Sequence, residues 1–316
     1  MAQHSLISVE HLSRRYGNTL AVNDVSFSVQ RGEVLGFLGP NGAGKSTTMQ
    51  MLTGNLAPSA GAIRINGIDL LEAPREAKRH LGFLPEQPPL YRDLNVDEYL
   101  GFCARLHQIP RARIARAVAE SKERCGLGEV GRRLIHQLSK GYQQRVGIAQ
   151  AIIHGPEVVI LDEPTVGLDP IQIREIRQLI RELGGEHSVI LSTHILPEVQ
   201  ATCDRVQIIQ RGELVLSDTI AGIVQRMQGS SVILGLRRPP DEASLLALEG
   251  VQAVQALDDG RLRILHARQH NPAEALATAA AQRDWGLYEL SPERLSLEEV
   301  FVNLTTRETP AEEGQP

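Results

Sequence analysis

The sequence has few cysteines, no long apolar run and no excess of basic residues, and each shortage excludes a class of protein. Its three cysteines, Cys103, Cys125 and Cys203, form no CxxC pair, so neither a metal knuckle nor a disulfide framework is indicated and a reduced, cytosolic chain is expected. No apolar run reaches the roughly 18 to 20 residues that span a bilayer, and the N-terminus lacks a basic-then-apolar signal. Any role at a membrane therefore requires a partner.

The net charge and the length of the chain indicate which partners and how many domains to expect. A formal net charge of −5 gives no reason to expect nucleic acid as a general partner, and 42% hydrophobic residues are ordinary for a folded protein. Because a single core rarely grows past roughly 250 to 300 residues, a chain of 316 residues is expected to form one large domain and a smaller one.

The strongest motif is a Gly-x4-Gly-Lys-Ser loop that follows the apolar run 34–38. Its glycines let successive backbone N–H groups face one anion, and the helix expected over residues 45–52 directs its positive end at the same point. Lys45 is then the charge on the β and γ phosphates of a nucleotide, and the Ser46 hydroxyl is a ligand for Mg²⁺. The predicted phosphate loop consists of Gly39, Pro40, Asn41, Gly42, Ala43, Gly44, Lys45, Ser46 and Thr47.

Two later apolar runs end in polar residues. Residues 158–161 are apolar and lead to Asp162 and Glu163, as expected for a buried strand that ends beside the phosphate loop. Asp162 is predicted to hold hydrated Mg²⁺, and Glu163 to orient or deprotonate the attacking water, since burying two unpaired acids would be costly. Residues 188–193 repeat the pattern and end at His194, which is placed to contact the γ phosphate and the water.

Three weaker signals surround this centre. Tyr16, beside Gly17-Asn18, could stack on an adenine ring or pack locally as a surface tyrosine. Gln87 follows a short strand that Pro85 interrupts, and could reach a bound metal from a mobile loop. Residues 96–153 are predicted to be helical, with an apolar stripe on the first helix that includes Leu106.

That helical region ends in Leu138-Ser-Lys-Gly-Tyr-Gln-Gln-Arg145, in which Ser139 can cap a helix and Gly141 can let the backbone approach an anion. This segment is predicted to be a second anion site, with an ordinary capped helix as the alternative. The arginines at 111, 113, 116, 132 and 133 are interpreted as a solvated helix face.

With these motifs in this order, residues 5–220 resemble the nucleotide-binding subunit of an ATP-binding-cassette (ABC) transporter. The resemblance implies an α/β P-loop cassette with a mixed core sheet, an antiparallel β subdomain and a helical subdomain at about 88–153. It also implies ATPase activity with ATP and Mg²⁺, and catalytic roles for Glu163, His194, Lys45 and Gln87. Its remaining expectations are Tyr16 as the adenine-stacking aromatic, Ser46, Gln87 and Asp162 as metal contacts, and Ser139, Gly141, Gln143 and Asp169 as ATP contacts. Lys140 and Tyr142 depart from the commonest signature, LSGGQ.

Within that family, segments 84–91, 138–142 and 296–301 are similar to bacterial ABC-2 type ATPases, the gliding-motility-associated group above all. The resemblance implies a head-to-tail homodimer enclosing two ATPs, membrane permease partners and export, with the chain on the inner face of the cell membrane and no nucleic-acid partner. The alternative is an ABC ATPase acting on nucleic acid or ribosomes, which usually has two cassettes or a long coiled-coil insertion. An ordinary phosphate-loop kinase leaves segment 138–145 unexplained.

Residues 221–306 carry no catalytic pattern and are predicted to form a small α+β domain of β-α-β-β-α-β order, with a hairpin turn at Asp258-Asp-Gly260. A capping box at residues 296–299 predicts a last short helix, and residues 307–316 are expected to be disordered. The domain is expected to stabilise the dimer or touch the membrane partner, with a fold-completing appendage as the alternative.

Overall fold

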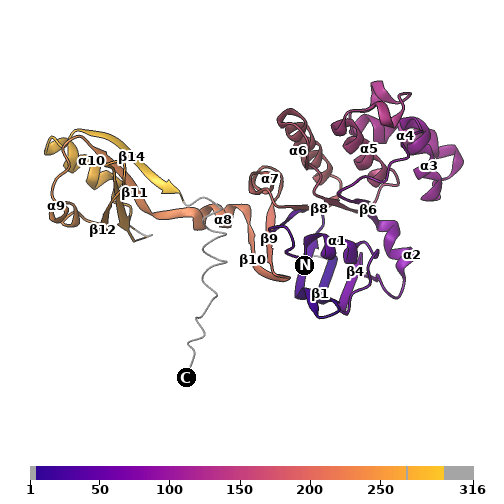
Figure 1. Ribbon diagram of the computed structural model, residues 1–316, viewed down its shortest axis with the longest axis horizontal. Helices are drawn as coiled ribbons and strands as arrows, with labels where there is room; N and C mark the ends of the chain where they lie inside the picture. Colours follow the sequence, from indigo (N-terminus) through magenta and orange to yellow (C-terminus); the bar gives the residue numbers. More distant parts are fainter. Residues whose placement is uncertain (1–4, 268–269, 295–316) are drawn as a thin grey trace. The chain divides into compact units, whose positions relative to one another are not determined.

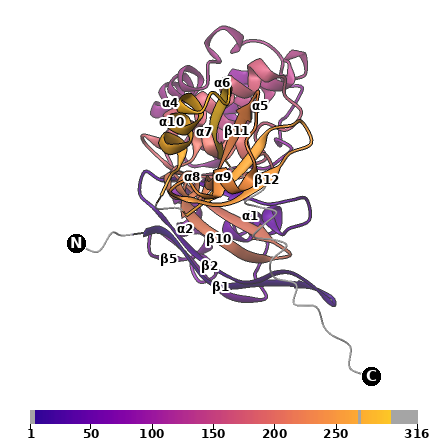
Figure 2. The ribbon, with the colours of Figure 1, turned by 90° about the vertical axis from the view of Figure 1, so that its left-hand side faces the viewer.

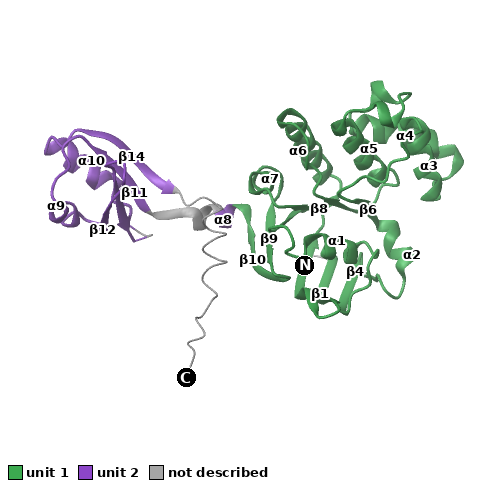
Figure 3. Ribbon diagram, viewed as in Figure 1, with its two compact units in different colours: residues 1–220 green, residues 221–316 purple. Residues whose placement is uncertain are grey.

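The computed structural model describes residues 5–267 and 270–294 of the chain. It divides into two compact units, residues 1–220 and 221–316 (Figure 3). The helix predicted at 296–299 and the disorder predicted for 307–316 lie outside the described residues.

The first unit is built on a six-stranded sheet of order β10-β9-β3-β8-β7-β6 (Figure 1). Strands β9, β3, β8, β7 and β6 run parallel, and β10 pairs antiparallel with β9 at one edge. Every residue of β3, β7 and β8 is buried, as expected for parallel strands covered on both faces. The strands are β3 (Val34–Leu38), β6 (Leu81–Leu84), β7 (Val158–Asp162), β8 (Ser188–Thr193), β9 (Arg205–Gln210) and β10 (Glu213–Thr219).

An antiparallel sheet of order β2-β1-β4-β5 forms a second layer, whose strands β1 and β2 lie side by side in Figure 2. Its last two strands, β4 and β5, turn at Asn66 and Gly67, a dipeptide that favours tight hairpin turns. The short helix α2 (Pro74–Ala77) follows it in the chain. The strands are β1 (Ser5–Tyr16), β2 (Thr19–Gln30), β4 (Ala60–Ile65) and β5 (Ile68–Asp69).

Helix α1 (Lys45–Leu52) packs into the hydrophobic core that the two sheets share. Met49, Met51 and Leu52 are fully buried there, and each such side chain contributes about 1.5–3 kcal/mol by leaving water. Phe27 of β2 and Phe37 of β3 join the same core, with ring centroids 5.7 Å apart. The start of α1, which carries the end of the phosphate loop, is therefore fixed between the two layers.

Three longer helices form the region between β6 and β7: α3 (Val96–Leu106), α4 (Arg111–Arg124) and α5 (Lys140–Ile152). Asn95 and Glu98 form a capping box at the start of α3. The apolar stripe predicted on α3 is buried except at Leu106, which is 65% exposed because the helix ends there at the surface. Helix α5 approaches β6 so closely that a side chain at Gly82 would meet the Ala151 carbonyl oxygen.

Helices α6 (Pro170–Gly184) and α7 (Leu196–Thr202) follow β7 and β8 in the chain. Asp169 caps α6, and Pro170 occupies its first position, where a missing N–H has no cost. No helix in the described part of the chain is long and apolar enough to cross a membrane.

The second unit contains an antiparallel sheet of order β12-β13-β11-β14, which is the order of a split-βαβ sandwich. The predicted α+β character is therefore confirmed, and Asp258-Asp-Gly260 lies between β12 and β13 as predicted. Helix α8 (Ile220–Met227), at the boundary between the units, was not predicted. The other elements are β11 (Gln228–Leu236), α9 (Glu242–Leu246), β12 (Val251–Ala256), β13 (Leu262–His266), α10 (Ala273–Gln282) and β14 (Leu287–Arg294).

The core of the second unit lies between this sheet and its two helices. Leu234 and Ile264 of the sheet pack with Leu276 of α10 and with Trp285, all of them buried. The polar side of the sheet carries ion pairs, among them Arg263 with Glu293. Among the residues that the structure describes in this unit, no group of His, Cys, Asp and Glu is arranged to hold a metal ion.

Candidate functional site

The candidate site forms where β3, β7 and β8 end. Leu38 pairs with Thr193, and Asp162 pairs with Ser192, so these three parallel strands stop at one edge of the sheet. The residues that come next, Gly39, Glu163 and His194, therefore start beside one another. The carboxyl edge of a parallel sheet is the usual place for a ligand in such folds.

The phosphate loop fits tightly against this edge. Gly42 and Gly44 have φ angles of 79° and 105°, in the left-handed region that favours glycine. A side chain at Gly39 would collide with the carbonyl oxygen of Ile209 in β9. Helix α1 begins directly after Gly44 with no side-chain cap, so the first-turn N–H groups point at the loop's concave side without a capping acceptor.

Lys45 lies at the centre of the loop and is 5% exposed. Its ammonium donates to the Gly39 carbonyl oxygen at 2.9 Å and lies 3.3 Å from Oε1 of Glu163. A cavity of about 270 Å³ opens beside it, lined also by Asn41 and His194. A buried ammonium on the wall of a cavity, with backbone amides around it, is suited to bind an anion.

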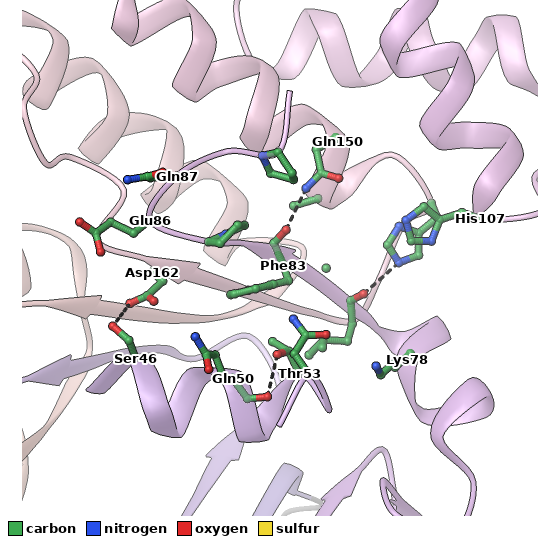
Figure 4. Close-up of a pocket in the computed structure, with 17 residues that line it drawn as sticks. Ser46, Gln50, Thr53, Lys78, Phe83, Glu86, Gln87, His107, Gln150 and Asp162 are labelled. Atoms are coloured by element: carbon green, nitrogen blue, oxygen red, sulfur yellow. Dashed lines mark hydrogen bonds between the residues drawn. The ribbon is translucent and has the colours of Figure 1, made fainter. Parts of the chain in front are cut away.

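Ser46 and Asp162 face each other across this edge, as Figure 4 shows. The Ser46 hydroxyl lies 3.5 Å from Oδ1 of Asp162, and the Ser192 hydroxyl donates to the same oxygen. Burial raises the pKa of Asp162, and the nearby Glu163 and Glu86 carboxylates raise it further, whereas the two serine hydrogen bonds lower it. The carboxylate and the hydroxyl are hard oxygen donors of the kind that Mg²⁺ takes together with substrate phosphates, and both line an open cavity.

Glu163 and His194 form the other polar pair at the strand ends. Nδ1 of His194 lies 2.9 Å from Oε2 of Glu163, and His194 remains 40% exposed. Glu163 has a φ of 48°, a left-handed conformation uncommon for a residue other than glycine, and its N–H donates to the Ser192 carbonyl oxygen. This turn in the backbone directs the carboxylate away from the strand toward Lys45 and His194.

The sequence reasoning did not single out Ser192. Its hydroxyl lies between the two acids, because it donates to Asp162 and accepts from the Glu163 N–H at 3.2 Å. The only signal in the sequence was the position of Ser192 two residues before His194. The pairing of β7 with β8 brings Ser192 opposite Asp162.

Gln87 lies on the loop after β6, next to Glu86 and across from Ser46 and Asp162 (Figure 4). Both loop residues are exposed and line a cavity of about 810 Å³, to which Ser46 and Asp162 also contribute. The structure thus places Gln87 on the same cavity as the predicted metal ligands Ser46 and Asp162.

Tyr16 is the last residue of β1 and remains 45% exposed. The guanidinium of Arg14 lies 4.8 Å from the centroid of its ring, which is a cation–π arrangement. Tyr16 does not line the cavity beside Lys45. The ring is accessible at the surface of the first unit, as a stacking platform must be.

The other predicted ATP contacts form a separate group. Ser139 caps α5, and the amide of Gln143 donates to the Leu138 carbonyl oxygen at 3.0 Å. Asp169 accepts from two N–H groups at the start of α6, and Gly141 lies against Gln172 of the same helix. The side chains of Gln143 and Asp169 are therefore occupied with local bonds.

This group does not meet the phosphate loop of its own chain. None of its four residues lines the two cavities beside Lys45 and Ser46. Gln150, near the opposite end of α5, does line the larger one, and it lies eleven positions after Ser139, about 16 Å along the helix. The chain thus has two groups of predicted nucleotide contacts at different places.

Comparison with known proteins identifies relatives along the whole chain. A family described as "ABC transporter" matches residues 22–166. The linearmycin resistance ATP-binding protein LnrL of Bacillus subtilis (strain 168) is 31% identical over 307 residues, which cover 96% of this chain and 99% of LnrL. The bacitracin transport ATP-binding protein BcrA of Bacillus licheniformis is 39% identical over 213 residues, 67% of this chain and 69% of BcrA.

Solved structures agree with these relatives. The structure described as the ATP-binding subunit of an ABC transporter is 33% identical, has a TM-score of 0.63, and is matched over 70% of this chain and 93% of its own. The structure of cbiO1 from Clostridium perfringens, described as part of the cbiONQ transporter complex, is 31% identical with a TM-score of 0.64, over 69% of this chain and 90% of its own. The expected P-loop cassette fold is confirmed, and an ATPase that acts on nucleic acid or ribosomes is not favoured.

Proposed function

The chain belongs to the ATP-binding proteins of bacterial ABC transporters of the ABC-2 type and is an ATPase, and we propose how its residues divide that work. Lys45 holds the β and γ phosphates of ATP, together with the backbone amides of the phosphate loop. Tyr16 stacks on the adenine. The exposure of Tyr16 and the burial of Lys45 beside a cavity support these roles.

Ser46, Asp162 and Gln87 are proposed to hold the metal ion. Mg²⁺ bound there would neutralise charge that develops on the phosphates. Asp162 is held for this task by the Ser192 hydroxyl, and its raised pKa reflects a carboxylate that is buried before its cation arrives. Gln87 sits on an exposed loop, so its contact depends on the position of that loop.

Glu163 and His194 are proposed to act on the attacking water. The Glu163 carboxylate accepts a hydrogen bond from the water and orients or deprotonates it, while His194 contacts the γ phosphate. Their 2.9 Å contact keeps both groups at the same wall of the cavity beside Lys45. When ATP enters, its γ phosphate competes with Glu163 for Lys45, which releases the carboxylate toward the water.

The observation that carries the proposal is the separation of Ser139 and Gly141 from the phosphate loop of their own chain. A single chain lacks these donors at its own γ phosphate, so a second copy must supply them. We therefore propose a head-to-tail homodimer that encloses two ATPs and separates after hydrolysis. Asp169, which caps α6 beside Gly141, and Gln143, which bonds the loop before α5, would shape this surface.

The partner of this ATPase is proposed to be an integral membrane permease, with the chain attached to the cytoplasmic side of the permease. The names of LnrL and BcrA, a resistance and a bacitracin transport protein, support export. Coupling would pass through the Gln87 loop and the adjoining helices. Residues 221–306 are proposed to stabilise the dimer or touch the permease, and removing residues 222–316 without changing either interaction would contradict that role.

The test of the proposal is the mass of the full-length Glu163→Gln protein by light scattering, with and without Mg-ATP. This change keeps the shape of residue 163 but removes its base, so ATP should bind without being hydrolysed. We expect a monomer or loose dimer without nucleotide and a compact dimer of twice the chain mass with Mg-ATP, together with a loss of ATPase activity of about 100-fold or more.

The matched control carries Gly141→Asp in addition to Glu163→Gln. A side chain at residue 141 starts against Gln172 of its own chain, and its carboxylate would add a negative charge to the surface that is proposed to meet the γ phosphate of the other chain, where like charges repel. In Mg-ATP the double variant should keep the mass of the nucleotide-free protein while still binding ATP. An unchanged mass for Glu163→Gln, or a dimer that forms equally well in the double variant, would contradict the proposed head-to-tail arrangement.

A further inference from the structure

One buried carboxylate near the site has no role in the function described so far. Glu198 lies in α7, four residues after His194, and is 1% exposed. A carboxylate so far from water is costly unless hydrogen bonds satisfy it. The hydrogen-bond partners of Glu198 therefore indicate its role in the fold.

Each oxygen of Glu198 accepts a hydrogen bond from a buried threonine. The Thr165 hydroxyl donates to Oε1, and the Thr193 hydroxyl donates to Oε2 at 2.8 Å. The two threonines are 2% and 0% exposed. The guanidinium of Arg177 lies 3.7 Å from Oε1 and supplies the nearby positive charge.

The threonines belong to two different segments of the site. Thr165 lies two residues after Glu163, in the turn that follows β7. Thr193 is the last residue of β8 and directly precedes His194. Its oxygen also accepts from the Ile195 N–H at 3.0 Å, which leaves its proton directed at Glu198.

We propose that Glu198 is a positioning residue for ATP hydrolysis. By binding Thr165 and Thr193 at once, it fixes the segment after Glu163 against the segment before His194, and so maintains the 2.9 Å contact between these two side chains. The proposal rests on the proposed roles of Glu163 and His194. Glu198 itself does not line the cavity beside Lys45.

A carboxylate suits this link better than an amide. Glu198 receives one hydroxyl donor on each oxygen, whereas glutamine would turn an NH₂ group toward one of the two threonines. A mispositioned Glu163 is expected to slow the chemical step while ATP binding at Lys45 continues. A loss of about 1 Å in the placement of reacting groups can cost on the order of 100-fold in rate.

The test uses steady-state ATPase kinetics of the full-length chain with Thr165→Val and Thr165→Ser. Valine keeps the shape of threonine and loses the bond to Glu198, whereas serine keeps the hydroxyl. For Thr165→Val we expect kcat to fall about tenfold or more, with KM for ATP within about twofold of the wild-type value. Thr165→Ser should restore most of kcat, and Glu198→Gln should resemble Thr165→Val.

Thr202→Val is the matched control on the same helix. The Thr202 hydroxyl is also buried, but it donates to the backbone carbonyl oxygen of Glu198 at 2.6 Å and does not join the two segments. Its kcat should stay within about twofold of wild type. A wild-type kcat in Thr165→Val, an equal loss in Thr202→Val, or a loss confined to KM would overturn the positioning role.

The variant Glu163→Gln separates this inference from the function on which it rests. If Glu163→Gln loses hydrolysis and Thr165→Val does not, only the positioning role of Glu198 is wrong. If Glu163→Gln hydrolyses ATP at the wild-type rate, the proposed role of Glu163 fails, and the role of Glu198 fails with it.

Discussion

The ammonium of Lys45 lies 3.3 Å from Oε1 of Glu163, and both side chains are more than nine-tenths buried. Without nucleotide, each is the other's oppositely charged neighbour inside the fold. Breaking one half of such a pair leaves the other charge buried and uncompensated, which costs more than removing both.

Replacing Lys45 with methionine is therefore expected to destabilise the nucleotide-free protein by about 3 kcal/mol, because Glu163 stays buried with only His194 beside it. Adding Glu163→Gln to Lys45→Met should recover part of that loss. Urea unfolding of the two single variants and the double variant measures the coupling. Strictly additive losses would mean that the pair does not stabilise the empty site, and ATP binding should be lost in both variants that lack Lys45.

The sequence predicted that Lys45, Glu163 and His194 lie together, because each of them follows a buried strand that is easy to recognise. A glycine-rich loop follows one buried strand, two acids end another, and a histidine ends a third. Parallel strands end at the same edge of a sheet, so the residues that follow them lie close together. This holds for any fold of the remaining chain. Proximity of Lys45, Glu163 and His194 therefore followed from pattern alone, while their chemical roles stay predictions.

The features that the sequence could not predict depend on which distant segments pair with each other, and on which side chains bond to nearby backbone groups. Ser192 matters because β8 pairs with β7, and Glu198 because α7 returns to both strand ends. Gln143 and Asp169 stay predicted ATP contacts, and the structure adds that their side chains also bond backbone groups near the starts of α5 and α6. No motif distinguishes such a bond from a ligand contact.

Tyr16 offers a test of where the adenine binds. Base stacking on an aromatic ring is worth about 1–3 kcal/mol when measured by alanine substitution. Tyr16→Ala is expected to weaken ATP binding about tenfold, whereas Tyr16→Phe should bind almost normally because the ring remains. Tyr288→Ala, which removes a similarly exposed tyrosine from the second unit, is the control in the same titration. Equal affinities for Tyr16→Ala and wild type would place the adenine elsewhere.

A stacked histidine pair gives the fold a pH dependence that is separate from catalysis. The rings of His154 and His107 are 3.8 Å apart and inclined by 6°, and Nε2 of His154 lies 3.2 Å from the Leu81 carbonyl oxygen. The pKa of His154 is lowered to about 4, mainly by burial and also by His107 and His187, while the Leu81 bond and Glu157 act in the opposite direction. Burial also lowers the pKa of His107.

Because the unfolded chain protonates His154 near pH 6.5 and the folded chain only near pH 4, the unfolded state binds more protons between these values. The stability present above pH 6.5 is therefore lost as the pH falls toward 4, by about 2 kcal/mol for this residue, given that it is partly accessible. The variant His154→Gln keeps a hydrogen-bond donor for the Leu81 carbonyl oxygen and removes the titrating imidazole.

Urea unfolding at pH 7.5 and pH 5 should show a smaller difference in the free energy of unfolding for His154→Gln than for wild type. His136→Gln, at an exposed histidine, should retain the wild-type difference, and an unchanged difference in His154→Gln would show that another group dominates acid unfolding.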